Sequence, residues 1–142
     1  FEDIQLPVDG AAEADWTGKT ILIVEDDKMS YIFLKEILKT TRANLLHAKT
    51  GNMAIEMSRN QDIDIILMDI KLPDISGYEA TSTIKKQKNI PVIAQTAFAM
   101  ADDHKKCIEV GCDDYLSKPI NRKKLLQSIA SQFHKNNKSL LN

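Results

Sequence analysis

Short apolar runs alternate along the chain with longer segments of helical periodicity. The apolar runs, rich in Ile, Leu and Val, predict strands at 21–24, 43–48, 63–68, 91–95 and 113–117. The segments between them repeat apolar residues every three to four positions and predict helices at 29–40, 50–60, 78–86, 102–110 and from 122 onward. Parallel neighbours in a sheet need crossover connections, which helices supply. The alternation therefore predicts an α/β domain, a parallel sheet of about five strands covered by about five helices.

The length of 142 residues suits one domain. We expect a linker or arm at 1–18, the folded domain at 19–134 and a frayed tail at 135–142. Trp16 is the exception in the arm, and we expect it to pack on the flank of the domain. Because the sequence begins with Phe1, we also expect it to be a fragment or a processed chain.

Charge and cysteine content exclude several classes of partner. Lys and Arg (19) nearly balance Asp and Glu (20), so no overall basic field attracts nucleic acid or an anionic membrane. No apolar run reaches the ~18 residues of a membrane helix, and no export signal opens the chain. We therefore expect a cytoplasmic domain in which Cys107 and Cys112 are reduced. A zinc site formed with His104 lacks a fourth ligand.

Polar residues follow four of the five predicted strands. In chain order they are Glu25-Asp26-Asp27, Asp69, Thr96 and Lys118. The carboxyl ends of parallel strands meet at one edge of a sheet, so we expect these side chains to converge. A helix-capping role explains Asp27. It does not explain Asp69, because a loop at 70–73 and no immediate helix follows this residue.

Converging carboxylates repel one another unless a cation lies among them, and oxygen ligands favour Mg²⁺. A carboxylate next to Mg²⁺ can attack phosphorus. A lysine and a hydroxyl can then hold the remaining phosphoryl oxygens. The pattern predicts a phosphoryl-transfer site with Asp26 and Asp69 at the metal, and with Lys118 and Thr96 at the phosphoryl group.

These strand-end motifs resemble the receiver domain of two-component response regulators. The matching stretches, in the family's order, are ILIVEDD at 21–27, LMDIKLP at 67–73, ISG at 75–77, QTA at 95–97 and GCDDYLSKP at 111–119. The likeness covers residues 19–134. It implies a single doubly wound, flavodoxin-like domain with strand order 2-1-3-4-5.

The resemblance assigns expected roles residue by residue. Asp69 matches the phospho-acceptor, which would become an aspartyl phosphate. Asp26 matches a direct ligand of Mg²⁺ (or Mn²⁺), and Glu25 a neighbour that acts largely through water. Lys71 stands where the family uses the backbone carbonyl as a metal ligand. The enzymatic activity implied for the domain itself is limited to its own phosphorylation and dephosphorylation.

The family also implies a switch. Thr96 and Lys118 match the residues that sense the phosphoryl group, Tyr115 matches an aromatic that turns inward, and Pro119 matches a residue after a cis peptide bond. A partner would read the change on the fourth strand, fourth helix and fifth strand, where the candidate positions are Phe98, His104, Lys105 and Tyr115. As a separate hypothesis, Lys71 and Phe98 shield the acyl phosphate and make it long-lived.

The expected partners follow from the same resemblance. They are a histidine kinase phosphodonor domain and then a histidine phosphotransfer protein or downstream regulator. The linker and the lack of a DNA-binding element after 134 are similar to receivers in hybrid sensor histidine kinases. A stand-alone regulator is the competing setting. A pseudo-receiver that never takes phosphate is the competing function, although no motif residue is missing.

Other phosphate chemistries fit less well. A P-loop at Gly18-Lys19-Thr20 fails because Glu13 replaces the required glycine. Flavin mononucleotide would be repelled by the three acids after the first strand. A haloacid-dehalogenase-type phosphatase needs a second Asp where Lys71 stands. Histidine phosphotransfer needs a helical bundle, and this chain alternates strands with helices.

Overall fold

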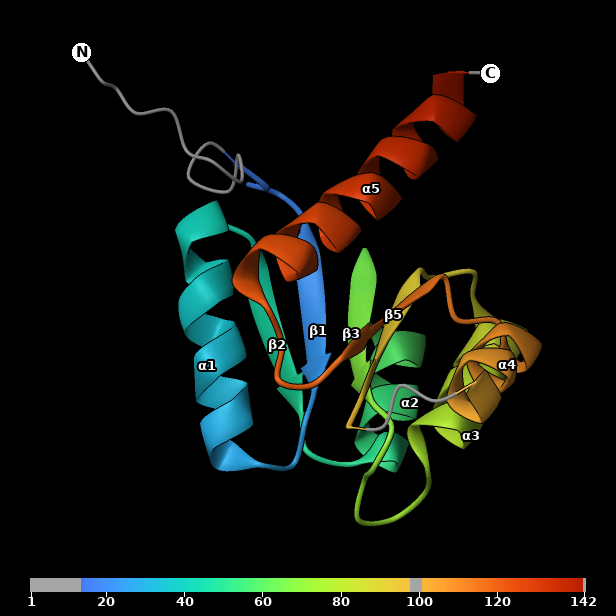
Figure 1. The fold of residues 1–142 in the computed structure, drawn as a ribbon. Helices are drawn as coiled ribbons and strands as arrows, with labels where there is room; N and C mark the ends of the chain where they lie inside the picture. Colours follow the sequence, from blue (N-terminus) through green and yellow to red (C-terminus); the bar gives the residue numbers. More distant parts are fainter. Residues whose placement is uncertain (1–13, 98–100, 142) are drawn as a thin grey trace.

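A five-stranded parallel sheet forms the centre of the molecule in the computed structural model, which describes residues 14–97 and 101–141 (Figure 1). The strands are β1 (Thr20–Val24), β2 (Asn44–Ala48), β3 (Ile65–Asp69), β4 (Val92–Thr96) and β5 (Asp114–Ser117). The helices are α1 (Lys28–Leu38), η2 (Lys39–Thr41), α2 (Gly51–Asn60), α3 (Gly77–Gln87), α4 (Ala101–Val110) and α5 (Arg122–Leu141). The strand order is β2-β1-β3-β4-β5, which confirms the expected doubly wound, flavodoxin-like fold.

Alternation along the strands divides the core into two layers. Ile21 and Ile23 of β1 face the layer formed with α1 and α5, whereas Leu22 and Val24 face α2 and α3. Figure 1 shows these helix pairs on opposite faces of the sheet. β3 is buried along its whole length, as its uninterrupted apolar sequence predicts. The fold thus holds the carboxyl ends of β1 and β3 rigidly next to each other.

Helix starts are defined by hydroxyl and carboxylate caps. Asp27, Thr50 and Ser76 each accept a hydrogen bond from the backbone N–H three residues later, at the starts of α1, α2 and α3. The capping role expected for Asp27 is therefore confirmed. Asp27 and Thr50 stand within three residues of the ends of β1 and β2, so the chain turns into each of these helices close to the carboxyl edge of the sheet.

The segment before β1 packs against α5 at the opposite edge of the sheet. The rings of Trp16 and Phe133 meet edge-on, with centroids 5.3 Å apart, and the Trp16 N–H donates to the Thr41 carbonyl at 2.7 Å. This confirms the expected anchor. α5 continues to Leu141, past residue 134 where we expected the domain to end, because no Gly or Pro interrupts the segment. No helix in the described ranges is long and apolar enough to cross a membrane.

Candidate functional site

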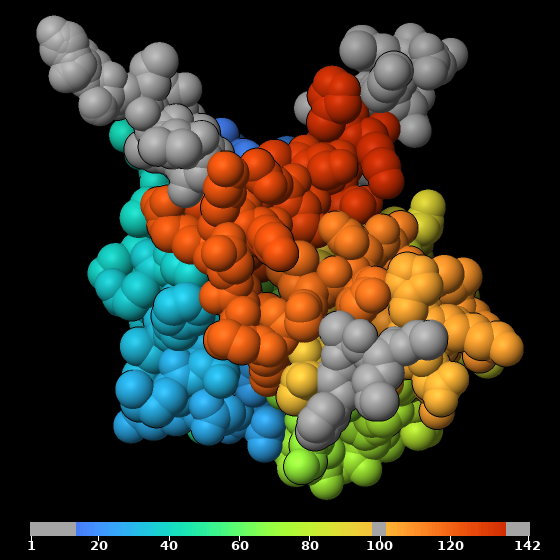
Figure 2. All heavy atoms as spheres, viewed as in Figure 1, coloured from blue at the N-terminus to red at the C-terminus, as the bar shows by residue number. Residues whose placement is uncertain are grey.

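A cavity of about 450 Å³ opens at the carboxyl edge of the sheet. Its walls come from the ends of β1, β3, β4 and β5, the loop after β3, and α4. The lining residues that carry charge or a hydroxyl are Glu25, Asp26, Asp27, Ser30, Asp69, Lys71, Thr96, Asp103 and Lys118. Figure 2 shows the segments after β1 (blue) and around the start of α3 (green) reaching the same lower edge of the molecule.

Three carboxylates meet in this cavity. Glu25, Asp26 and Asp69 each offer an oxygen, and these atoms all lie within 4.8 Å of one another. The register explains the meeting, since Val24 pairs with Met68 and the next residues of both strands follow side by side. Glu25 is 1% and Asp69 4% exposed, whereas Asp26 is exposed. Two buried acids and one open acid form a cluster that a small cation can enter from solvent.

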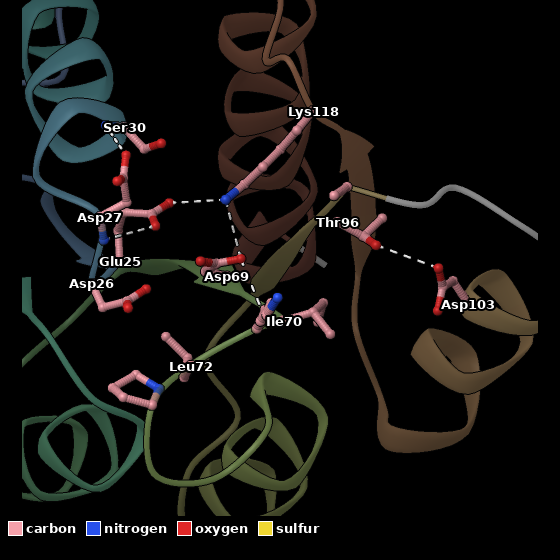
Figure 3. Close-up of a pocket in the computed structure, with 13 residues that line it drawn as sticks. Glu25, Asp26, Asp27, Ser30, Asp69, Ile70, Leu72, Thr96, Asp103 and Lys118 are labelled. Atoms are coloured by element: carbon pink, nitrogen blue, oxygen red, sulfur yellow. Dashed lines mark hydrogen bonds and ion pairs between the residues drawn. The ribbon is translucent and has the colours of Figure 1, made fainter.

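Lys118 reaches between the two buried acids, as Figure 3 shows. Its Nζ lies 3.2 Å from Glu25 Oε1 and 3.2 Å from Asp69 Oδ1. Burial alone would lower the pKa of Lys118, but the charges of Asp69 and Glu25 raise it above its usual value. The ammonium therefore stays charged and holds the two carboxylates in place.

Glu25 is electrostatically the most perturbed acid of the cluster. Burial, together with the hydrogen bond and charge of Asp69, raises the pKa of Glu25 to about 7, against the opposing effect of Lys118. The single positive charge of Lys118 thus does not balance the negative charges of the three carboxylates. A divalent cation held by the three carboxylates would favour the ionised form of Glu25, so the donor set fits a hard ion such as Mg²⁺.

The backbone around Asp69 is fixed from two sides. The Lys71 N–H donates to Asp69 Oδ1 at 3.3 Å, and the Gly77 N–H donates to the Ile70 carbonyl at 2.8 Å. A Cβ on Gly77 would overlap the Asp69 carbonyl oxygen and approach Ile70 Cα to 2.7 Å. α3 can start this close to Asp69 only because residue 77 is glycine.

Thr96 ends β4 on the far side of the cavity from Glu25. Its hydroxyl donates to Asp103 Oδ2 of α4 at 3.4 Å, and Asp103 Oδ1 accepts from the Tyr78 hydroxyl at 2.9 Å. Figure 3 shows the Thr96 side chain directed toward Asp103, away from Lys118. Thr96 is buried, so its hydroxyl is held by the protein around it.

The expected switch aromatic lies outside the cavity wall. Tyr115 is half-buried on β5 and its ring meets the exposed His104 ring edge-on, with centroids 4.9 Å apart. Lys105, which follows His104 on α4, is also exposed. Phe98, the other expected surface residue, lies outside the described residues.

The sequence did not reveal that His47 contacts the backbone of Glu25. His47 Nε2 lies 2.8 Å from the Glu25 carbonyl oxygen, which can only accept, so this nitrogen carries the proton. The His47 ring stacks on Tyr31 with centroids 3.6 Å apart and planes 5° apart. The stacked pair fixes the backbone that carries Glu25 and Asp26.

The predicted site residues largely come together. Glu25, Asp26, Asp69, Thr96 and Lys118 line one cavity, and Lys71 lies at its wall with an exposed side chain. The Lys118–Pro119 peptide is cis, as expected.

Asp103 was missed because it lies on an ordinary polar helix with no motif spacing to reveal it. Cys107 and Cys112 are both free thiols.

Comparison with known proteins gives one family. The model of the response regulator receiver domain matches residues 21–130. The polar-differentiation response regulator DivK of Brucella ovis is 35% identical over 116 residues, covering 80% of this chain and 94% of DivK.

Solved structures of receiver domains are also similar to this chain. A CheY-like receiver domain protein from Methanospirillum hungatei superimposes with a TM-score of 0.81 at 30% identity, covering 85% of this chain and 98% of that one. The receiver domain of sensor histidine kinase PA1611 from Pseudomonas aeruginosa gives a TM-score of 0.72 at 35% identity, covering 78% and 93%, and carries a magnesium ion in its active site cleft. With its sheet order and its acidic cavity, the chain belongs to the response regulator receiver domains of two-component signalling.

Proposed function

We propose that the chain takes a phosphoryl group from a phosphohistidine onto Asp69 in a cytoplasmic phosphorelay. The phosphodonor is a histidine kinase domain, and Mg²⁺ or Mn²⁺ is held by Glu25, Asp26, Asp69 and the Lys71 backbone carbonyl. The observation that carries the proposal is the meeting of three carboxylate oxygens within 4.8 Å beside the Lys118 ammonium. When bound, the cation supplies positive charge to the phosphoryl oxygens.

The chain's own residues perform the transfer. A carboxylate oxygen of Asp69 attacks phosphorus, an O–P bond forms, and the N–P bond of the phosphohistidine breaks, with its electron pair returning to the imidazole. Lys118 stays next to Asp69 throughout and stabilises the negative charge. Positioning by the fixed backbone at 69–71 supplies much of the remaining catalysis.

The same residues would switch the surface. The new phosphoryl group carries about −1.5 to −2 charges, by analogy with other phosphorylated side chains. It attracts the Thr96 hydroxyl and Lys118, and Tyr115 moves with β5. The altered surface, which includes His104 and Lys105, is read by a histidine phosphotransfer protein or a downstream regulator.

Intact mass spectrometry tests the proposal directly. The protein is incubated with acetyl phosphate and Mg²⁺, and we expect the mass to rise by one phosphoryl group. Asp69→Asn, which keeps the shape of the side chain, should gain nothing, whereas Asp102→Ala, at an exposed carboxylate of α4, should behave as the parent. EDTA should abolish the gain. A parent chain that stays unmodified would instead indicate a pseudo-receiver.

We keep the receiver of a hybrid sensor histidine kinase as the proposed setting, supported by the 35% identity to the PA1611 receiver. The match to nearly the whole of DivK favours a second setting, a stand-alone regulator. An antibody against this domain distinguishes them in cell extracts. A band far above 16.0 kDa supports the kinase, and a band near that mass supports the free regulator.

The lifetime of the phosphoryl group is a separate proposal. Lys71 is exposed at the wall of the cavity, next to the acceptor, where its side chain can shield the acyl phosphate. We expect Lys71→Ala and Phe98→Ala to hydrolyse faster than the parent, measured as loss of the added mass with time. Unchanged hydrolysis in both variants would refute the shielding.

A further inference from the structure

One carboxylate that lines the cavity, that of Asp103, lies outside the acid cluster and outside the motifs that supply it. Asp103 lies in the first turn of α4 and is half-buried. Its two oxygens accept from different elements, Oδ2 from Thr96 at the end of β4 and Oδ1 from Tyr78 at the start of α3. Asp103 therefore ties α4 to the end of β4 and to the start of α3, as the right-hand part of Figure 3 shows for Thr96.

The Tyr78 side of this link is the firmer one. The O···O distance is 2.9 Å, and burial together with the Asp103 contact raises the pKa of the phenol well above its usual value. The phenol thus remains a donor at any physiological pH. Tyr78 also follows Gly77, whose backbone packs against that of Asp69. Asp103 is in this way anchored to the segment that positions the acceptor.

The Thr96 side of the link is the weaker one. Its O···O distance of 3.4 Å is well beyond the ordinary ~2.7–2.8 Å for hydroxyl donors. A phosphoryl group on Asp69 offers the Thr96 hydroxyl competing charged oxygens, and a hydrogen bond of ordinary length to one of them is stronger than the long contact to Asp103. The same group faces Asp103 across the cavity that both residues line, and like charges repel.

We propose that Asp103 is a latch that holds α4 and the Thr96 hydroxyl in the unphosphorylated arrangement, and that phosphorylation opens it. This rests on the proposed function of Asp69. When the phosphoryl group forms, Thr96 exchanges its Asp103 partner for a phosphoryl oxygen, and Asp103 loses its tie to β4. Of the two hydrogen bonds that the Asp103 side chain makes with the described residues, the one from Tyr78 then remains. Asp103 is a positioning residue, acting on the phosphoryl group through Thr96.

Affinity for a phosphoryl mimic measures the latch. Beryllofluoride with Mg²⁺ is titrated into the full chain. We expect Asp103→Ala to bind it roughly three- to tenfold more tightly, because binding no longer breaks a hydrogen bond. Asp102→Ala removes an equal charge from the same turn and should match the parent. Asp103→Asn keeps an accepting oxygen and should fall between the two.

Tyr78→Phe separates the latch from simple charge removal. It leaves the Asp103 carboxylate in place and removes only its anchor. The latch predicts about two- to threefold tighter binding of beryllofluoride in Tyr78→Phe. It predicts faster amide hydrogen exchange in α4 in both Tyr78→Phe and Asp103→Ala. If Tyr78→Phe behaves as the parent in both measurements, the effect of Asp103 is charge alone and the latch is overturned.

The hydrogen-exchange arm needs no phosphoryl group, so it reports on Asp103 even before any transfer. If the parent takes up phosphoryl but the Asp103 variants match Asp102→Ala, the latch fails and the proposed function stands. If the parent takes up neither phosphoryl nor beryllofluoride, the proposed function fails, and the coupling through Asp103 fails with it. Unfolding curves of each variant confirm that the compared proteins are folded.

Discussion

The two sides of the cavity are built differently. On the β1–β3 side, Glu25 and Asp69 are buried and share the Lys118 ammonium at 3.2 Å, and neither β1 nor β3 has an exposed residue. On the β4–α4 side, Thr96 reaches Asp103 at 3.4 Å, and although β4 itself is buried, the neighbouring β5 is only half-buried or exposed. One side holds charges in fixed positions, and the other holds a hydroxyl by a long contact.

Under the proposed function, this difference separates phosphoryl transfer from the response to it. Phosphoryl transfer needs a preorganised acceptor, since a small misplacement of reacting groups costs a large part of the rate. A response needs an element with two arrangements of similar free energy. If Asp69 is the acceptor as proposed, the side held by Lys118 provides the first, and the side with the long Thr96–Asp103 contact provides the second. Substitutions on the two sides should therefore differ in how large their effects are and in which property they change.

Gly77→Ala should cause the largest loss, on the fixed side. The new methyl group would overlap backbone atoms of Asp69 and Ile70, which cannot rotate away, so we expect destabilisation of about 3 kcal/mol in urea unfolding. Gly51→Ala is the control, because its methyl group would meet only side chains, chiefly that of Ile75. Equal losses in the two variants would show that the backbone of Asp69 is not held rigidly.

The pH dependence of metal affinity sharpens the comparison. With a pKa of about 7, Glu25 must lose a proton before it carries full charge. We therefore expect Mg²⁺ affinity, measured by calorimetry, to rise about tenfold between pH 6 and 8, since a proton competes for the site below pH 7. Glu25→Gln should bind more weakly and show a much flatter profile. A slope that survives in Glu25→Gln would assign the titration to another group.

The metal-free protein should show the opposite trend in stability. Because the folded-state pKa of Glu25 lies above the ordinary 4.5, the folded state binds more protons across this interval. The contribution of Glu25 is full below pH 4.5 and is lost as the pH rises through about 7. Saturating Mg²⁺ should reverse this loss, as measured by unfolding at several pH values.

His47→Leu should have a moderate effect, again on the fixed side. It removes the hydrogen bond to the Glu25 carbonyl and the stack on Tyr31, and we expect a loss of about 1 kcal/mol in stability. Mg²⁺ affinity should fall severalfold because the backbone carrying the acids is freed. His47→Gln can retain the donor and serves as the matched variant. Unchanged affinity in His47→Leu would limit this residue to a packing role.

His104→Ala should have the smallest effect, on the responsive side. Its exposed ring touches Tyr115 only by an edge contact, so we expect a loss of about 0.5 kcal/mol and unchanged Mg²⁺ affinity. Binding of a downstream partner would be the sensitive readout. A loss as large as that of His47→Leu would show that the two sides are equally rigid.

The fold and the acid cluster could be predicted because both depend on local patterns. Apolar runs of strand length set the sheet, and β1 and β3 end where the first acidic residue stands, with Glu25 directly after β1 and Asp69 as the last residue of β3. The boundaries were less accurate: the strand expected at 63–68 is observed at Ile65–Asp69. The Asp64 side chain accepts from the Thr20 N–H at 2.7 Å, so this residue caps the sheet before the strand begins.

The contacts of Asp103 and His47 could not be predicted from spacing. Asp103 meets Tyr78 across 25 positions, and His47 meets Glu25 across 22, in both cases through the packing of whole elements. Their residue types are common on polar helix faces and strand edges. Only the three-dimensional arrangement distinguishes a carboxylate that joins three elements from one that is merely hydrated.

The contact between Trp16 and Phe133 has a mechanical consequence. It fastens the segment before β1 to α5 at the amino edge of the sheet, whereas the acids stand at the carboxyl edge. A pull or rotation applied through residue 16 is taken up by aromatic packing and the Thr41 carbonyl, a full strand length from Asp69. The domain can thus be tethered or reoriented without displacing the Asp69 carboxylate.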